Sequence, residues 1–261
     1  MATLPNPLPK LVADPSGRSL GLQLPPGVLL DATEGGPWHE PLLWYAGRAV
    51  SPGNWAALGA PAARVGLLPV LVDLGGGQGG PEGWELMPGE VSYPGDHDAE
   101  DVLAEYWDDV AHEESGGEPW PGLAAPLALI AAPDARAAEV ADSLAEGRPW
   151  LKDPHLALAP ARRSADIPAA IGWSGPLNHD DDVARLCAVL RSWEDRFGIR
   201  VVALGFDHLT VSVAAPPATR AEAEAIAAEH FAFCPDNVDP DRLEAYADGL
   251  VGEHAWHFWW D

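Results

Sequence analysis

The chain has 261 residues, 47% of them hydrophobic, so it can bury a substantial core as one large domain or two modest ones. Its 40 Asp and Glu residues outnumber its 15 Lys and Arg residues, which gives a formal net charge of -25. Because such a surface repels phosphate groups and anionic lipid head groups, we expect neither a nucleic-acid nor a membrane partner. The acidity indicates either a solubility device or a surface adapted to a basic protein or a cation.

The N-terminal stretch MATLPNPLPKLVADPSG is interrupted by prolines and lacks the apolar segment of a signal peptide. No later stretch approaches the length of a membrane span. Cys187 and Cys234, the two cysteines, fall on predicted apolar helix faces, which suits reduced thiols better than a disulfide framework. We therefore expect a cytoplasmic protein.

The first half of the chain is rich in Pro, Gly and Trp. Its apolar runs predict short strands at GLQLPPGVLL (21–30), PLLWYAG (41–47) and RVGLLPVLVDL (64–74). GGGQGGPEG (75–83) then predicts a loop. Gly75, Gly77 and Gly80 match the dinucleotide-binding fingerprint, but Pro81 stands where its helix should begin, which favours a plain loop.

A helix is predicted to follow Asp98, its N-cap, because apolar residues from Ala99 to Val110 recur at spacings of three and four. Its outer face is acidic, with Glu100, Glu105, Asp108, Asp109 and Glu113. A second loop at 113–122 then separates an N-terminal α+β segment, residues 1–118, from a more regular C-terminal α/β module, residues 119–261.

The C-terminal module is expected to begin with βα units. PLALIAAP (126–133) predicts a strand, and Asp134 is the expected N-cap of a helix that runs to about Glu146. HLALAP (155–160) predicts the next strand, followed by a short helix with Ser164 as its cap.

The remaining elements predict an α-β-β-α-α-β order and an α+β fold class. The first helix spans Asp180 to Phe197 and ends at Gly198, and two strands follow, the second half-buried. Thr219 and Glu222 form a capping box, and Asp239 with Pro240 begins the last helix. HAWHFWWD closes the chain as a strand, with Trp256, Phe258 and Trp260 on one face.

EHFAFCPDN (229–237) raises the question of a catalytic thiol, because His230 lies four residues before Cys234. Both residues lie on the stripe of their helix that packs inward. Pro235 ends the helix and leaves the thiol at its negative end, where a thiolate is not stabilised. Structural packing is the favoured interpretation, with a nucleophile or a metal ligand as alternatives.

Acidic turns at 96–98, 179–182 and 236–241 each precede a helix, so capping explains them. A calcium loop starting at Asn237 would need Gly where Arg242 stands and Glu where Asp248 stands. No Walker A loop, HExxH, GxSxG or paired CxxC is present. We therefore expect no metal and no cofactor.

Tryptophan is abundant, with 12 residues in the chain, of which Trp256, Trp259 and Trp260 lie in the last six. Large rings with one polar atom serve cores and binding surfaces alike. These three residues are therefore either core residues or the candidate binding surface.

From about Trp173 to Asp261 the chain resembles a bacterial family known as domain of unknown function 4253. The resemblance is carried by LRSWEDRFGIRVVALGFDHLTVSVAAPP, EHFAFCPDN and the terminal FWWD, in that order. It implies an α+β domain of soluble bacterial proteins and implies no activity and no catalytic residues.

Charge and tryptophan content together favour a non-enzymatic, acidic protein-binding protein, for instance an immunity or inhibitor protein that neutralises a basic effector. The alternative is an enzyme with a site in the cleft between the two halves. Its candidate catalytic residues are Asp207, His208, His230, Cys234 and Asp236. The oligomeric state is not predicted.

Overall fold

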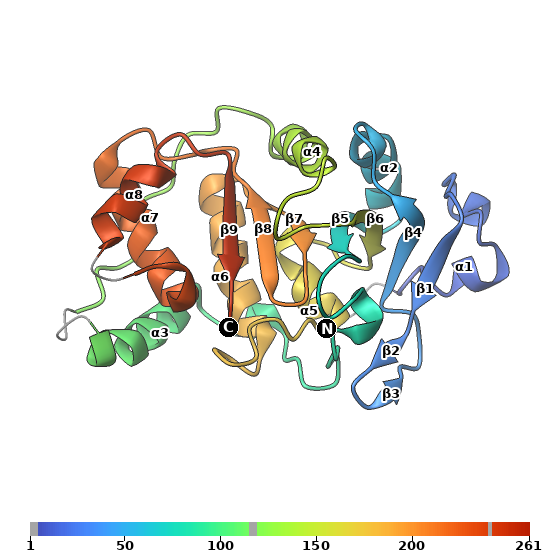
Figure 1. Ribbon diagram of the computed structural model, residues 1–261, viewed down its shortest axis with the longest axis horizontal. Helices are drawn as coiled ribbons and strands as arrows, with labels where there is room; N and C mark the ends of the chain where they lie inside the picture. The colour runs from blue at the N-terminus through green and yellow to red at the C-terminus, as the bar shows by residue number, and fades with distance from the viewer. Residues whose placement is uncertain (1–4, 115–118, 240–241) are drawn as a thin grey trace.

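The computed structural model describes residues 5–114, 119–239 and 242–261. Its main element is a seven-stranded mixed sheet in the order β1-β4-β6-β5-β7-β8-β9 (Figure 1). The strands are β1 Gly27–Leu30, β4 Leu43–Ala49, β5 Leu68–Asp73, β6 Pro154–Ala159, β7 Arg200–Leu204, β8 His208–Ser212 and β9 Ala255–Trp259. A separate two-stranded ribbon consists of β2 Ala32–Thr33 and β3 Gly36–Pro37.

The helices of the described residues are α1 Lys10–Ala13, α2 Asn54–Ala63, α3 Ala99–Glu114, α4 Pro133–Leu144, α5 Ile167–Ile171, α6 Val183–Phe197, α7 Arg220–Phe233 and α8 Leu243–Leu250. The fold class is α+β, as the sequence predicted. The C-terminal order α6-β7-β8-α7-α8-β9 is also the predicted one.

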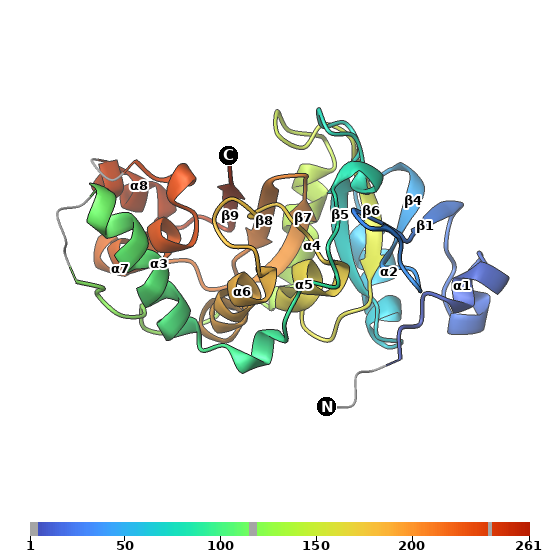
Figure 2. The same cartoon turned by 90° about the horizontal axis from the view of Figure 1, so that it is seen from below.

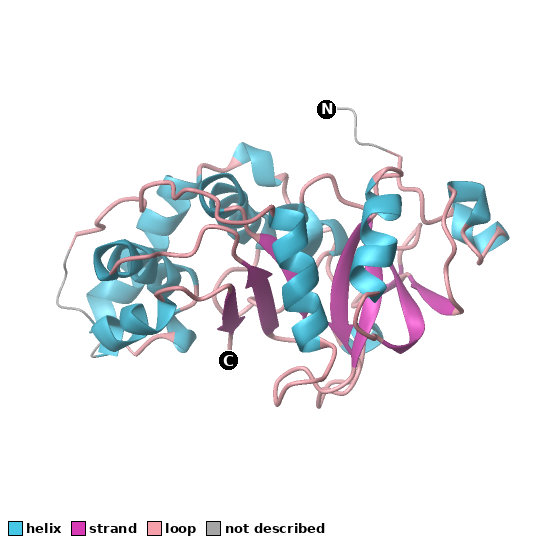
Figure 3. Cartoon of the chain, turned by 90° about the horizontal axis from the view of Figure 1, so that it is seen from above, coloured by secondary structure: helices cyan, strands magenta, loops and turns pink. Residues whose placement is uncertain are grey.

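The sheet is covered on both faces. In β5, Val70 and Val72 face one hydrophobic cluster while Leu71 faces the other, as alternation along a strand requires. Helices α3, α5, α6 and α7 contribute to the first cluster, and α5 and α6 lie in front of the strands when the molecule is seen from below (Figure 2). Helices α2 and α4 belong to the second cluster and lie over the sheet when it is seen from above (Figure 3).

The two predicted segments share this sheet. Strand β6, from the segment after residue 118, lies between β4 and β5 from the segment before it, and pairs antiparallel with both. Strand β5 in turn pairs parallel with β7, Leu71 with Ala203 and Val72 with Leu204. Part of the predicted boundary loop, 115–118, and the predicted helix start at Pro240 lie outside the described residues.

Several helix and strand signals are confirmed. Thr219 and Glu222 form a reciprocal capping box on α7, and Gly198 ends α6 with a positive φ of 63°. Asp98 Oδ1 accepts hydrogen bonds from the backbone N–H groups of Glu100 and Asp101 at the start of α3. Trp256, Phe258 and Trp260 are all buried on one face of β9 and its extension.

Residues 126–133 are not the predicted strand. Both edges of β7 are occupied, by β5 and β8, so this run cannot pair beside β7. It instead crosses the end of α6, where Leu127 N–H donates to the carbonyl of Arg196, and its Leu129 and Ile130 are exposed.

Two predicted caps differ. Asp134 does not cap α4 but accepts a hydrogen bond from Arg200, and Ser164 Oγ accepts from the N–H of Val201. At both positions a tertiary partner competes with the local N–H groups. The acidic turn at 179–182 does cap α6, through Asp182, whose side chain accepts from the N–H of Ala184, and the helix begins at Val183 rather than at Asp180.

Strand β8 is buried on both faces rather than half-buried. Thr210 and Ser212 alternate with apolar residues as predicted, yet their exposed fractions are 1% and 0%. Helix α4 covers this second face, together with the loop that carries Trp150, which packs on His257 of the neighbouring strand.

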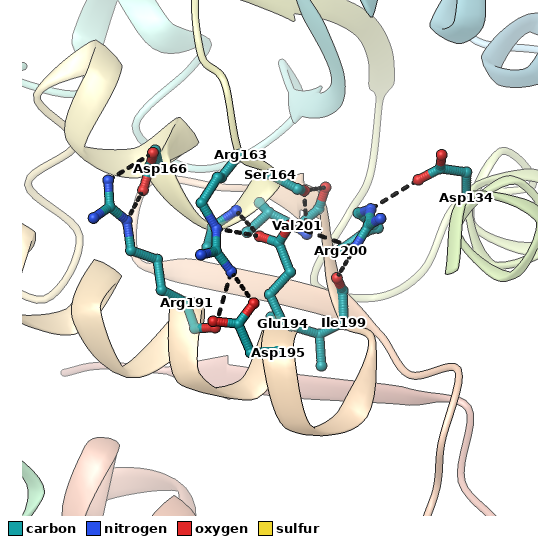
Figure 4. Close-up of polar contacts among 11 residues, drawn as sticks. Asp134, Arg163, Ser164, Asp166, Arg191, Glu194, Asp195, Ile199, Arg200 and Val201 are labelled. Atoms are coloured by element: carbon teal, nitrogen blue, oxygen red, sulfur yellow. Dashed lines mark hydrogen bonds and ion pairs between the residues drawn. The ribbon is translucent and has the colours of Figure 1, made fainter. Parts of the chain in front are cut away.

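Ion pairs attach the C-terminal half of α6 to its surroundings (Figure 4). Arg191 pairs with Asp166, which immediately precedes α5. Arg163, from the loop after β6, pairs with Asp195 of α6. These contacts fix α6 against the segment that connects β6 to α5.

A buried ion pair holds α6 against α7. Glu229 of α7 has an exposed fraction of 0% in its side chain and receives Arg196 Nη1 and Nη2 at 2.7 and 2.6 Å. The same carboxylate accepts from Trp193 Nε1–H and from the N–H of Ala124, each at 2.7 Å. Four donors therefore satisfy one buried charge.

Replacing this carboxylate should destabilise the fold strongly. Glu229→Ala leaves the Arg196 guanidinium largely buried without its carboxylate partner, and we expect the free energy of unfolding to fall by about 3–5 kcal/mol in urea melts. Glu224→Ala, on the same helix, removes an exposed pair with Arg220 and should cost less than about 1 kcal/mol. Equal losses for the two variants would show that the buried pair does not stabilise α6 against α7.

Candidate functional site

A pocket of about 510 Å³ opens at the carboxyl ends of the parallel strands β5 and β7. Open α/β sheets commonly bind ligands where adjacent parallel strands end. The pocket lies between residues of the first half of the chain and residues of the second. Its lining consists of Asp73, Gly76, Gly77, Gln78, Gly79, Pro149, Trp150, Lys152, Gly205, Phe206, Asp207 and His208.

Asp207 and His208 form a hydrogen-bonded pair on the pocket wall. Asp207 Oδ1 lies 2.5 Å from His208 Nδ1, and its Oδ2 accepts from Trp259 Nε1–H at 3.2 Å. A carboxylate acceptor requires the proton on Nδ1 of a neutral imidazole, which leaves Nε2 with a free lone pair. The pair therefore has the arrangement of an oriented base.

An aromatic wall borders this imidazole. The Trp150 ring is nearly parallel to the His208 ring, at 7° and 6.2 Å between centroids, and lies 4.4 Å from the ring of His257. Burial, helped by the nearby Arg148 and His208, lowers the pKa of His257 to about 4, so that its ring is neutral at pH 7. His257 Nδ1 lies 2.8 Å from Thr210 Oγ1.

The glycine-rich segment forms another part of the pocket lining. Gly79 N–H donates to the carbonyl of Gly76, which closes a turn, and among the described residues no protein acceptor receives the N–H groups of Gly76, Gly77 and Gln78. Gly75 is required by close packing, since a Cβ there would lie 2.8 Å from Lys152 Cβ. The loop thus presents backbone donors beside the pocket.

His230 lies elsewhere, inside the aromatic core on the α6–α7 side of the sheet. Its ring contacts Trp193, Trp256 and Phe258, and its Nδ1 lies 3.0 Å from Tyr246 Oη. Burial lowers the pKa of His230 to about 3. The neutral ring is enclosed by other side chains and has no route to the pocket lining.

Cys234 is also buried, and its Sγ–H donates to the carbonyl of Trp259 at 3.0 Å. Burial raises the pKa of this thiol and of the Cys187 thiol. Asp236 accepts a hydrogen bond from the N–H of Asp261. Of the five candidate catalytic residues, the structure thus places Asp207 and His208 at the pocket, and His230, Cys234 and Asp236 outside its lining.

Two of the three C-terminal tryptophans are also buried, and the third is exposed beside the pocket residue Asp207. Trp256 and Trp260 are buried in the core, with exposed fractions of 2% and 1%. Trp259 points to the other face of β9, is 37% exposed, and supports Asp207 through its indole N–H. Of the three, Trp259 is the one that a partner molecule can reach without unfolding the strand.

Sequence reasoning missed Asp73, Trp150, Lys152 and the glycine loop as pocket residues. One signal was available for Asp73, because a carboxylate that ends a buried apolar strand before a glycine run is typical of a site at strand ends. Trp150 and Lys152 carry no such signal, since their position depends on where β6 pairs.

Within the described ranges, no group of three or more His, Cys, Asp or Glu side chains is arranged to hold a metal ion. None of the helices in the same ranges has the length and apolar character needed to cross a bilayer.

Residues 155–261 match the family model described as domain of unknown function, DUF4253. The resemblance expected from about Trp173 is confirmed, and the match begins earlier, within β6. The C-terminal part of the chain is therefore similar to this domain, and the matched residues include Asp207 and His208. No curated protein and no solved structure matches the chain.

Acid should destabilise the fold through His230. Its pKa is about 3 in the native state against 6.5 for the free side chain, so the unfolded chain binds more protons between these values. The contribution of the neutral His230 to the free energy of unfolding should therefore be fully present above pH 6.5 and should be lost as the pH falls towards 3. Urea melts between pH 7.5 and 4.5 measure this effect. In the wild type, protonation of His230 on unfolding raises the unfolding constant by up to roughly tenfold for each pH unit of acidification, and His230→Phe should remove that contribution.

His39→Phe is the matched control, because His39 is exposed. It should leave the pH dependence of the wild type unchanged. The same slope in the wild type and in His230→Phe would contradict a neutral, buried His230.

Proposed function

We propose that this protein is an enzyme that hydrolyses a small ester or amide in the strand-end pocket, with His208 as the general base. The observation that carries the proposal is the hydrogen-bonded Asp207–His208 pair, both of whose residues line a pocket of about 510 Å³. The size is within the range of small-molecule sites.

Water is the proposed attacking group, since the pocket lining contains no hydroxyl or thiol side chain. His208 Nε2 takes a proton from the water while its oxygen bonds to the carbonyl carbon. The resulting imidazolium is stabilised by Asp207 and returns the proton to the leaving oxygen or nitrogen as its bond to carbon breaks. One bond to carbon forms and one breaks, and no redox partner is required.

Charge on the carbonyl oxygen needs donors across the pocket from His208. The N–H groups of Gly76, Gly77 and Gln78 and the Lys152 ammonium are the candidates, because they line the pocket and the three N–H groups lack protein acceptors among the described residues. Fixed backbone donors of this kind typically contribute the largest share of catalysis in acyl transfer.

Removal of the base tests this proposal. His208→Ala should lower kcat/KM for p-nitrophenyl acetate by about 10²–10⁴-fold, the usual contribution of a positioned base. Asp207→Asn should give a smaller loss, because the imidazole keeps its place but loses the fixed tautomer. The release of p-nitrophenolate measures both.

His39→Ala is the control for hydrolysis by an exposed imidazole, and it should retain the wild-type rate. Circular dichroism confirms that each variant is folded. A folded His208→Ala variant with the wild-type rate would exclude His208 as the base.

The second candidate is the protein-binding role that charge and tryptophan content predicted. It is favoured by the outer face of α3, where Glu100, Asp101, Glu105, Asp108 and Asp109 are all exposed. The side chain of Glu113 lies outside the described part of the helix. Such a row of carboxylates suits a basic protein partner, and association would be steered by charge.

This candidate predicts a local effect of charge. With cytochrome c as a basic probe, binding by the double variant Glu100→Lys, Asp101→Lys should weaken at least about tenfold, and wild-type binding should weaken with salt. The control Glu34→Lys, Glu90→Lys changes two exposed carboxylates elsewhere and has the same net charge. Equal weakening of both variants would leave α3 without a specific role.

For the enzyme as for the binding protein, we propose the cytoplasm as the compartment. Both cysteines are free thiols in the structure, and reduced thiols are the rule in that compartment.

A further inference from the structure

Asp73 is the other carboxylate on the pocket wall, and its two oxygens have different surroundings. Oδ1 accepts the N–H groups of Gly75 at 3.1 Å and Asp153 at 2.8 Å, which fixes the side chain at the end of β5. Within the described chain no protein donor reaches Oδ2. This second oxygen faces Gly76, where a Cβ would lie 3.4 Å from it.

The carboxylate is nearly buried in this position. Asp73 has an exposed fraction of 4% and lines the pocket, so water or a ligand in the pocket is the remaining partner for Oδ2. Lys152 lines the same pocket but forms no ion pair with Asp73 among the described residues. Asp207, by contrast, has both oxygens occupied, by His208 and Trp259.

We infer that Asp73 Oδ2 binds a cationic nitrogen of the substrate, so that the substrate class is a small ester or amide with an ammonium or amidinium group. The ester or amide bond of this substrate rests on the proposed hydrolysis, whereas its cationic group rests on Asp73 alone. Phe206, Pro149 and Trp150 supply apolar surface in the same pocket for the body of such a molecule.

The geometry supports this assignment. A charge-assisted hydrogen bond to a fixed carboxylate is about twice as strong as a neutral one. The anchored Oδ1 keeps Oδ2 in place without a ligand, so binding requires little rearrangement. Gly76 has no side chain that would cover the oxygen, whereas any other residue would place a Cβ in contact with it.

Three planar molecules of nearly the same shape test the inference: benzamidinium, benzamide and benzoate. In calorimetric titrations of the full chain, we expect benzamidinium to bind at least about tenfold tighter than benzamide, with benzoate weakest. Asp73→Asn should abolish the preference for benzamidinium over benzamide. Asp153→Asn, which removes a neighbouring carboxylate outside the pocket lining, should retain it.

Gly76→Ala is a second variant that keeps both bonds to Asp73 Oδ1 and places a methyl group against Oδ2. It should weaken benzamidinium binding more than benzamide binding, which keeps the test valid if Asp73→Asn does not fold. His39→Ala, an exposed substitution outside the pocket lining, should bind benzamidinium as the wild type does.

The two proposals fail in different ways. Equal binding of benzamidinium and benzamide by the wild type, or an unchanged preference in folded Asp73→Asn and Gly76→Ala, overturns the cation site even if hydrolysis depends on His208. Cation binding through Asp73 without His208-dependent hydrolysis overturns the enzyme and retains the site.

Discussion

The parallel pairing of β5 with β7 is the contact on which the rest of the arrangement depends. It joins the strands of the first half of the chain to the β7-β8-β9 part of the sheet. Because the two strands run in the same direction, their carboxyl ends meet at one edge and bring Asp73 close to the Gly205–His208 turn. All other pairings of the main sheet are antiparallel, so this is the one place where adjacent strands both lead outwards into loops.

Signals confined to a few neighbouring residues were read correctly from the sequence. The capping box at Thr219 and Glu222, the stop at Gly198 and the alternation of Trp256, Phe258 and Trp260 depend on local hydrogen bonding and periodicity. Where a distant partner competes, the same logic failed. Ser164 bonds to Val201 and Asp134 to Arg200, contacts that no local pattern reveals.

The candidate site was predictable only in part, for the same reason. Asp207 and His208 are adjacent in sequence, so their pairing needed no knowledge of the fold. Asp73 reaches the pocket because β5 pairs with β7, and Trp150 because the loop before β6 folds over β8 and β9. His230 and Cys234 attracted notice by their spacing, yet they face the opposite side of the sheet from His208.

The position of β6 has a consequence for how this polypeptide can be divided. The matched region begins at residue 155, and yet β6 pairs only with β4 and β5, both of which precede that region. Expressed alone, the region would carry β6 with neither neighbour and β7 with one edge bare, and exposed strand edges promote association between chains. In a nascent chain, β4 likewise waits for 105 residues of synthesis, from Ala49 to Pro154, and β5 for 81, from Asp73 to Pro154, before β6 emerges between them. Excised domains and ribosome-bound fragments of this protein should therefore associate through these open edges until the missing strands are supplied.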